Sequence, residues 1–130
     1  MPEKTGFKNC STCGQMWFTR EDLLYDPEVS LFGYQVHFLD RSLGLFYFNH
    51  QKDNCRTIFA VNVSEFLDLY NGPIYQENKM GDEDCPLYCL RRTDMRPCQL
   101  QCECAYVREI MQTIRTIHAE AEIKEALALA

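Results

Sequence analysis

The sequence has 130 residues and a net charge of −6, and 46% of its residues are hydrophobic and 12% aromatic. This composition is too apolar for a disordered chain, and no apolar run approaches the ~20 residues that a membrane-spanning helix needs. A chain of this length can form one domain with its own core, and its negative charge disfavours a general nucleic-acid-binding role.

The first half of the chain predicts a small antiparallel sheet. Thr19 with Asp22 three residues later is a variant of the capping box, which predicts a short helix over 20–25 that ends before Pro27. Alternating apolar residues predict a strand within 29–38, and apolar or β-branched runs predict two more strands over 45–48 and 57–63. Aromatic residues on these strands are expected to fill the core.

The second half predicts helices separated by an irregular segment. Ser64 is a candidate cap for a short helix over 65–70, which Gly72 and Pro73 would end. The segment 74–103 has no sustained periodicity. A long helix over about 105–127 follows, because its apolar residues recur at spacings of three and four: Val107, Ile110, Met111, Ile114, Ile117 and Ala121.

The eight cysteines are the strongest chemical signal. No secretion signal precedes them in residues 1–9, so we expect a cytoplasmic protein, in which thiols stay reduced and clustered cysteines indicate metal binding. Cys10 and Cys13 lie on a tight turn, with Gly14 able to adopt the positive φ that such a turn needs. His50 and Cys55 flank the predicted loop 51–54, so together they complete a four-ligand zinc set.

The Cys-x-x-Cys-Gly string formed by Cys10, Cys13 and Gly14 resembles the knuckle of zinc-ribbon and rubredoxin-like sites. The resemblance covers only these five residues. It implies a structural metal site and identifies no function.

The second group consists of five cysteines within twenty residues: Cys85, Cys89, Cys98, Cys102 and Cys104. One zinc ion needs four ligands, so one thiol is spare, and Cys102 and Cys104 are the ambiguous members. A disulfide or redox-active pair and an iron–sulfur cluster are the alternatives. The two groups together predict two zinc ions.

We therefore expect an α+β fold in which residues 1–104 form a zinc-binding domain and residues 105–130 form an amphipathic helix. This helix would pack on the domain, or would contact a protein partner or a second copy. The sequence has no Gly-rich phosphate loop and no nucleophile–base arrangement that its spacing supports, so nothing in it argues for an enzyme. The hypothesis is a non-enzymatic protein-interaction or regulatory module, and its rival is a thiol-based redox protein centred on the second cysteine group.

Overall fold

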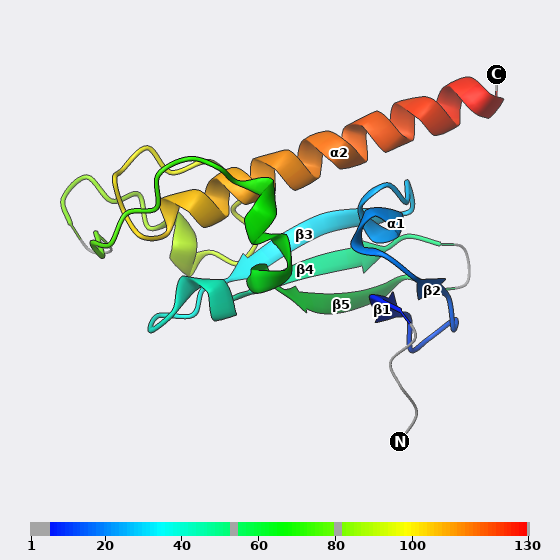
Figure 1. Cartoon of the computed structure of the whole chain (residues 1–130), viewed down its shortest axis with the longest axis horizontal. Coiled ribbons are helices and arrows are strands. Elements are labelled where there is room, and N and C mark those ends of the chain that lie inside the picture. The colour runs from blue at the N-terminus through cyan, green and yellow to red at the C-terminus, as the bar shows by residue number, and fades with distance from the viewer. Residues whose placement is uncertain (1–5, 53–54, 80–81, 130) are drawn as a thin grey trace.

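The computed structural model describes residues 6–52, 55–79 and 82–129. Its architecture is α+β, as predicted, with a three-stranded antiparallel sheet, short helices and a long C-terminal helix (Figure 1). A separate two-stranded sheet, which was not predicted, adds to it. The elements in chain order are β1 (Lys8–Asn9), β2 (Met16–Trp17), α1 (Arg20–Leu24), β3 (Val29–Gln35), η1 (Arg41–Leu43), β4 (Leu45–His50), β5 (Thr57–Asn62), η2 (Val63–Leu69), η3 (Tyr88–Leu90) and α2 (Ala105–Leu129).

The larger sheet has the order β3-β4-β5, so each strand pairs with the next one along the chain. Its buried face pairs Leu31 with Phe48 and Tyr34 with Phe46, and Phe46 in turn faces Val61. The register shifts between Leu31 and Gly33, which marks a bulge in β3. One face of the sheet is therefore a continuous apolar surface.

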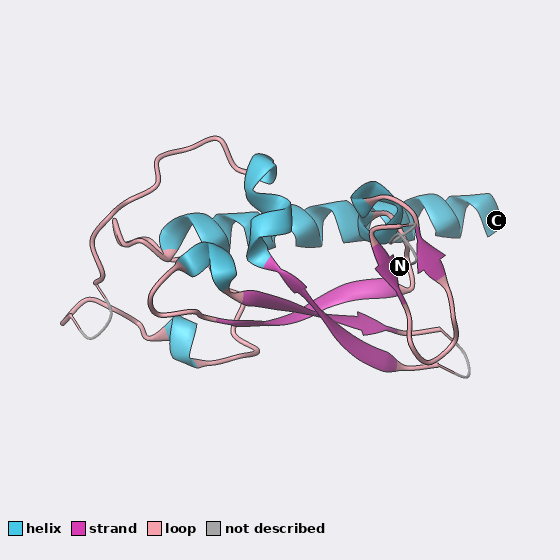
Figure 2. Ribbon diagram, turned by 60° about the horizontal axis from the view of Figure 1, so that its bottom comes forward, coloured by secondary structure: helices cyan, strands magenta, loops and turns pink. Residues whose placement is uncertain are grey.

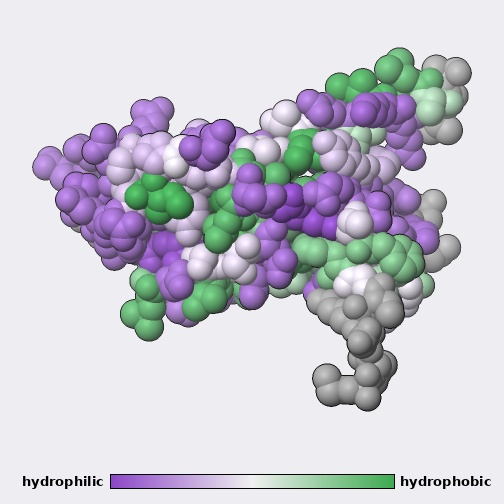
Figure 3. Space-filling model, in the orientation of Figure 1, coloured by the Kyte–Doolittle hydropathy of each residue, from purple (hydrophilic) through white to green (hydrophobic). Residues whose placement is uncertain are grey.

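Helix α2 covers this face of the sheet (Figure 2). The stripe that the sequence predicted is buried for most of its length, with Val107 and Ile110 fully enclosed and Ile114 only 2% exposed. The helix thus packs on its own chain through these residues. Its last turns extend beyond the sheet, where Ile123 and Leu127 are exposed, and a partner contact there stays a prediction (Figures 1 and 3).

The short elements differ in part from what the sequence predicted. The Thr19–Asp22 capping box at the start of α1 is confirmed, because each side chain bonds to the other residue's backbone. Strand β3 ends at Gln35, so Phe38 lies beyond the strand and is exposed. The helix over 65–70 is a 3₁₀ helix that begins at Val63, and its capping position is Asn62, which makes no side-chain cap bond; the prediction that Ser64 caps it is wrong.

Candidate metal centre

The turn from Cys10 to Gly14 joins β1 to β2. The amide of Gly14 donates to the carbonyl of Cys10, and the amide of Cys10 donates to the carbonyl of Gln15, both at 2.8 Å. Gly14 has a φ of +79°, the left-handed conformation that favours glycine over other residues. This geometry buries Cys10 almost completely and leaves Cys13 exposed at the tip of the turn.

His50 and Cys55 approach the same turn from the larger sheet. His50 is the last residue of β4 and is fully buried, while the amide of Cys55 donates to the carbonyl of Lys52 at 2.9 Å. Of the loop over 51–54 that was expected to arch over a metal ion, residues 53 and 54 lie outside the described part. The two ends of that loop nevertheless bring His50 and Cys55 to Cys10 and Cys13.

The ligand atoms of Cys10, Cys13, His50 and Cys55, here called the Cys/His group, all lie within 4.8 Å of one another. The sulfurs of Cys10 and Cys55 are 3.5 Å apart, as are the Cys55 sulfur and Nδ1 of His50. Two sulfurs on one tetrahedral zinc ion are about 3.8 Å apart, given Zn–S bonds of about 2.3 Å. The Cys/His group can therefore hold a metal ion with little rearrangement.

The surroundings of the Cys/His group favour a bound cation. Burial raises the pKa of the Cys10 thiol, but hydrogen bonds from the Cys13 amide and the His50 side chain outweigh it, and the pKa falls to about 6. A thiolate, the form that binds metal, is thus accessible near neutral pH. Nε2 of His50 is buried and has no hydrogen-bond partner among the described residues, so hydrogen bonding alone does not explain why this ring is buried.

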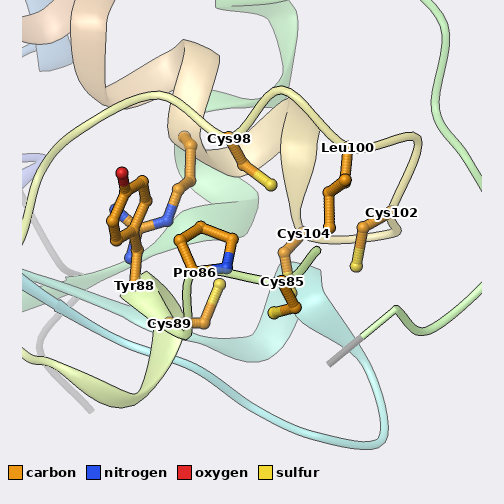
Figure 4. Close-up of a pocket in the computed structure, with 9 residues that line it drawn as sticks. Cys85, Pro86, Tyr88, Cys89, Cys98, Leu100, Cys102 and Cys104 are labelled. Atoms are coloured by element: carbon orange, nitrogen blue, oxygen red, sulfur yellow. The ribbon is translucent and has the colours of Figure 1, made fainter. Parts of the chain in front are cut away.

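All five cysteines of the second group line one small cavity, together with Pro86, Tyr88, Leu100 and Arg108 (Figure 4). This five-cysteine pocket has a volume of about 10 Å³. Within the described residues, only the Cys/His group brings three or more ligand atoms within 4.8 Å of one another. The sulfurs of the five-cysteine pocket share a cavity, but no three of them form such a group.

Cys102 and Cys104, the two ambiguous cysteines, are both buried at the pocket, and each sulfur accepts a hydrogen bond. The Cys104 sulfur accepts from Nε of Arg41 at 2.9 Å, and the Cys102 sulfur from the amide of Lys79 at 3.3 Å. Hydrogen bonding with the Cys104 thiol, opposed by burial, lowers the pKa of Cys89 to about 6, and the same bond helps to raise the pKa of Cys104. The five sulfurs thus line one pocket, and neither Cys102 nor Cys104 stands apart from it as the spare thiol.

Two arginines at the five-cysteine pocket were not among the predicted site residues. These residues are Arg41 and Arg108, and both are buried. A signal for Arg108 was present in the sequence, because it lies four residues after Cys104 and three before Met111, on the apolar face of the helix. No comparable signal marked Arg41, which reaches the pocket from the turn between β3 and β4.

The remaining histidines belong to neither group. Nδ1 of His37 accepts a hydrogen bond from the amide of Asp40 at 3.1 Å, and His118 pairs with Glu122 one turn along α2.

All eight cysteines are free of disulfide bonds. Across the described residues, no helix has both the length and the apolar character that a membrane crossing requires.

Comparison with known proteins found no similar protein or family. No family model matches the sequence, and no significant match was found among the curated proteins or the solved structures. The geometry of the two cysteine groups is therefore the basis for any functional proposal.

Proposed function

We propose that this protein is a non-enzymatic zinc-binding module in which the metal has a structural role. The observation that carries the proposal is the mutual approach of the four ligand atoms of the Cys/His group to within 4.8 Å. Three thiolates and one imidazole form a common structural zinc set, and four protein ligands leave no open position for water or substrate. Such a closed site stabilises a fold without performing chemistry.

The Cys/His group lies between the small β1–β2 hairpin and the larger sheet, so an ion bound there would join them. Strands β1 and β2 have only two residues each, too few to be stable as an isolated pair. A zinc ion bound by Cys10 and Cys13 on one side, and by His50 and Cys55 on the other, would fix this small hairpin to the end of the larger sheet. Because structural zinc is worth about 10–16 kcal/mol in small finger peptides, the ion would dominate the stability of this region.

We also propose a second zinc ion in the five-cysteine pocket, with four of its five thiols as ligands. Its support is weaker than that for the first ion, since it rests on a shared cavity rather than on sulfurs at ligating distance. The competing function is thiol redox chemistry, in which two of these cysteines would form a disulfide. The two functions differ in metal content and in the number of free thiols.

The biological role proposed for the module is binding another protein, or a second copy of itself, in a cytoplasmic setting. The exposed end of α2, with Ile123 and Leu127, supports this role because these apolar side chains are not covered by the chain's own sheet. A negative overall charge makes nucleic acid an unfavourable partner.

Elemental analysis of the protein purified without added metal tests the proposal. We expect two zinc ions per chain, one ion after Cys13→Ser or His50→Ala, and one after the double substitution Cys89→Ser and Cys98→Ser, because a single substitution leaves four thiols in the second group. The Cys13 variant and the double variant serve as controls for each other, because each removes ligands from a different group. The structural-zinc function would be contradicted if the variants kept the zinc content of the wild type. It would also be contradicted if a thiol titration of the denatured wild-type protein found fewer than eight free thiols.

A further inference from the structure

The five-cysteine pocket contains a buried positive charge without an evident counter-charge. Arg108 is fully buried, and its Nη1 donates to two neutral carbonyls, those of Asp94 at 2.6 Å and Arg96 at 3.0 Å. Nε and Nη2 of Arg108 have no hydrogen-bond partner among the described residues. Since a guanidinium is always protonated in proteins, burying it without an anion is strongly unfavourable.

Nearby groups compensate this charge only in part. The rings of Tyr88 and Tyr34 lie 5.5 and 6.0 Å from the guanidinium carbon, but they are neutral. The carboxylate of Asp94 is close enough to Arg108 to interact with it electrostatically, but it is paired with Arg96 at 2.7 Å, and among the described residues no ion pair joins Arg108 to a carboxylate. The sulfurs that line the same cavity are the remaining candidates for negative charge.

A second cation, Arg41, contacts the pocket from η1, the short helix between β3 and β4. Nε of Arg41 donates to the Cys104 sulfur at 2.9 Å, and its Nη2 lies 2.8 Å from the partly exposed carboxylate of Glu103. The charge of Arg41 is therefore shared between a sulfur and a carboxylate. Arg108 has no such carboxylate, so negative charge in the pocket would stabilise Arg108 more than Arg41.

We infer that the five-cysteine pocket is a mononuclear metal–thiolate centre whose negative charge is balanced by Arg108, with Arg41 as a second donor to its sulfurs. The inference rests on the proposed second zinc ion. Four thiolates around one divalent ion carry a net charge of −2, opposite in sign to the charge of Arg108 and to that of Arg41, which Glu103 shares. Neutral thiols or a disulfide would leave Arg108 with only the partial compensation that Asp94 and the two tyrosine rings provide.

The cavity between the five cysteines is small, with a volume of about 10 Å³, and its thiols suit a single ion. The pocket residues between 85 and 104 have only one turn of 3₁₀ helix, η3, so this segment can close further around an ion. Arg108 would then act as a positioning residue that donates to the ligand sulfurs.

Cadmium-113 NMR of the full chain tests the inference, because a four-sulfur site and a three-sulfur, one-nitrogen site give separate resonances in one sample. For the wild type we expect both. Competition with a chelator should show that Arg108→Met weakens metal binding at the four-sulfur site by about 10–100-fold and leaves the other site unchanged. Arg108→Lys, which keeps the charge, should recover part of the loss. Arg115→Met, an exposed arginine on the same helix, is the matched control and should change neither site.

The outcomes separate this inference from the proposed function. Absence of the three-sulfur, one-nitrogen resonance would contradict the Cys/His zinc site and leave the inference standing. A missing four-sulfur resonance, or unchanged affinity of that site in both Arg108 variants, would overturn the inference. If Arg108→Met does not fold, Arg108→Lys alone decides. Weaker metal binding at the four-sulfur site in Arg108→Lys, with wild-type affinity in Arg115→Met, supports the role of Arg108. Unchanged affinity in both variants opposes it.

Discussion

The indole ring of Trp17 meets the imidazole ring of His50 edge to face, with 5.0 Å between the ring centroids and 72° between their planes. Trp17 belongs to the small hairpin and His50 to the larger sheet, so this contact joins the two sheets beside the Cys/His group. Nε1 of Trp17 also donates to the carboxylate of Asp26 at 2.9 Å. The aromatic contact and the hydrogen bond together fix the ring that lies next to a proposed metal ligand.

The single tryptophan makes metal release from the Cys/His group observable. Trp17 is only 2% exposed, and we expect a chelator to loosen the hairpin, hydrate the indole and shift its fluorescence emission to longer wavelength. Cys98→Ser should show the same shift, because it leaves the Cys/His group intact. An emission spectrum that does not change while zinc is removed from a Cys98→Ser protein would show that the hairpin is held without the ion.

Asp26 is predicted to contribute more to stability than an exposed acidic residue. Its carboxylate accepts hydrogen bonds from Trp17 and, at 3.0 Å, from the side-chain amide of Gln15. Asp26→Ala would leave partly buried donors without a partner, and we expect a loss of about 1–3 kcal/mol in unfolding free energy. Asp68→Ala, which removes an exposed ion pair with Arg20, is the control and should cost much less. Equal losses in denaturant titrations would argue against this role for Asp26.

The helix α2 is predicted to have a core half and a surface half. Ile114 is 2% exposed, so Ile114→Ala should cost about 2–5 kcal/mol. Ile123 is 60% exposed, so Ile123→Ala should change stability by less than about 0.5 kcal/mol. Thermal unfolding measures both.

The exposed end of α2 can be tested separately for self-association. If it forms a homodimer contact, the wild type should sediment as a dimer at high concentration and Ile123→Glu as a folded monomer. A wild type that stays monomeric would remove self-association and leave a different protein as the proposed partner.

Gly33 is predicted to be required by close packing rather than by backbone conformation. A Cβ atom at this position would lie 2.6 Å from the carbonyl oxygen of Arg92, and the neighbouring amide of Tyr34 donates to the same oxygen at 2.8 Å. Gly33→Ala should therefore cost about 1–3 kcal/mol. Gly72→Ala is a suitable control, since its Cβ would meet only the side chain of Tyr70, which can move. Similar melting temperatures for the two variants would contradict the packing argument.

The parts of the fold that were predictable from the sequence have strong periodic or capping signals. The strand within 29–38 follows from a period of two, the strands around Phe46 and Ile58 from apolar and β-branched runs, and the stripe of α2 from a period of 3.6. The capping box of α1 follows from Thr19 and Asp22. The Cys/His group was predictable because a hairpin necessarily brings its ends together, so His50 and Cys55 had to be neighbours.

What could not be predicted depends on contacts between segments distant in the sequence. Strands β1 and β2 are two residues long and leave no periodic signal. Arg41 is 63 residues from Cys104, and nothing local to either indicates their hydrogen bond. Phe18 is exposed although it follows the buried Trp17, which takes the inward-facing position of β2.

The hydrogen bond between Cys10 and Cys55 spans 45 positions of the chain, and this separation has a consequence for the order of assembly. The turn at Cys10 can form early, since its contacts are local, but it can meet Cys55 only after a long loop has closed and the β4–β5 hairpin has formed. During refolding, uptake of metal by the complete ligand set should therefore follow closure of this loop and not formation of the turn. A cell that synthesises this chain with little free zinc would accumulate it with the sheet formed and the amino-terminal turn undocked.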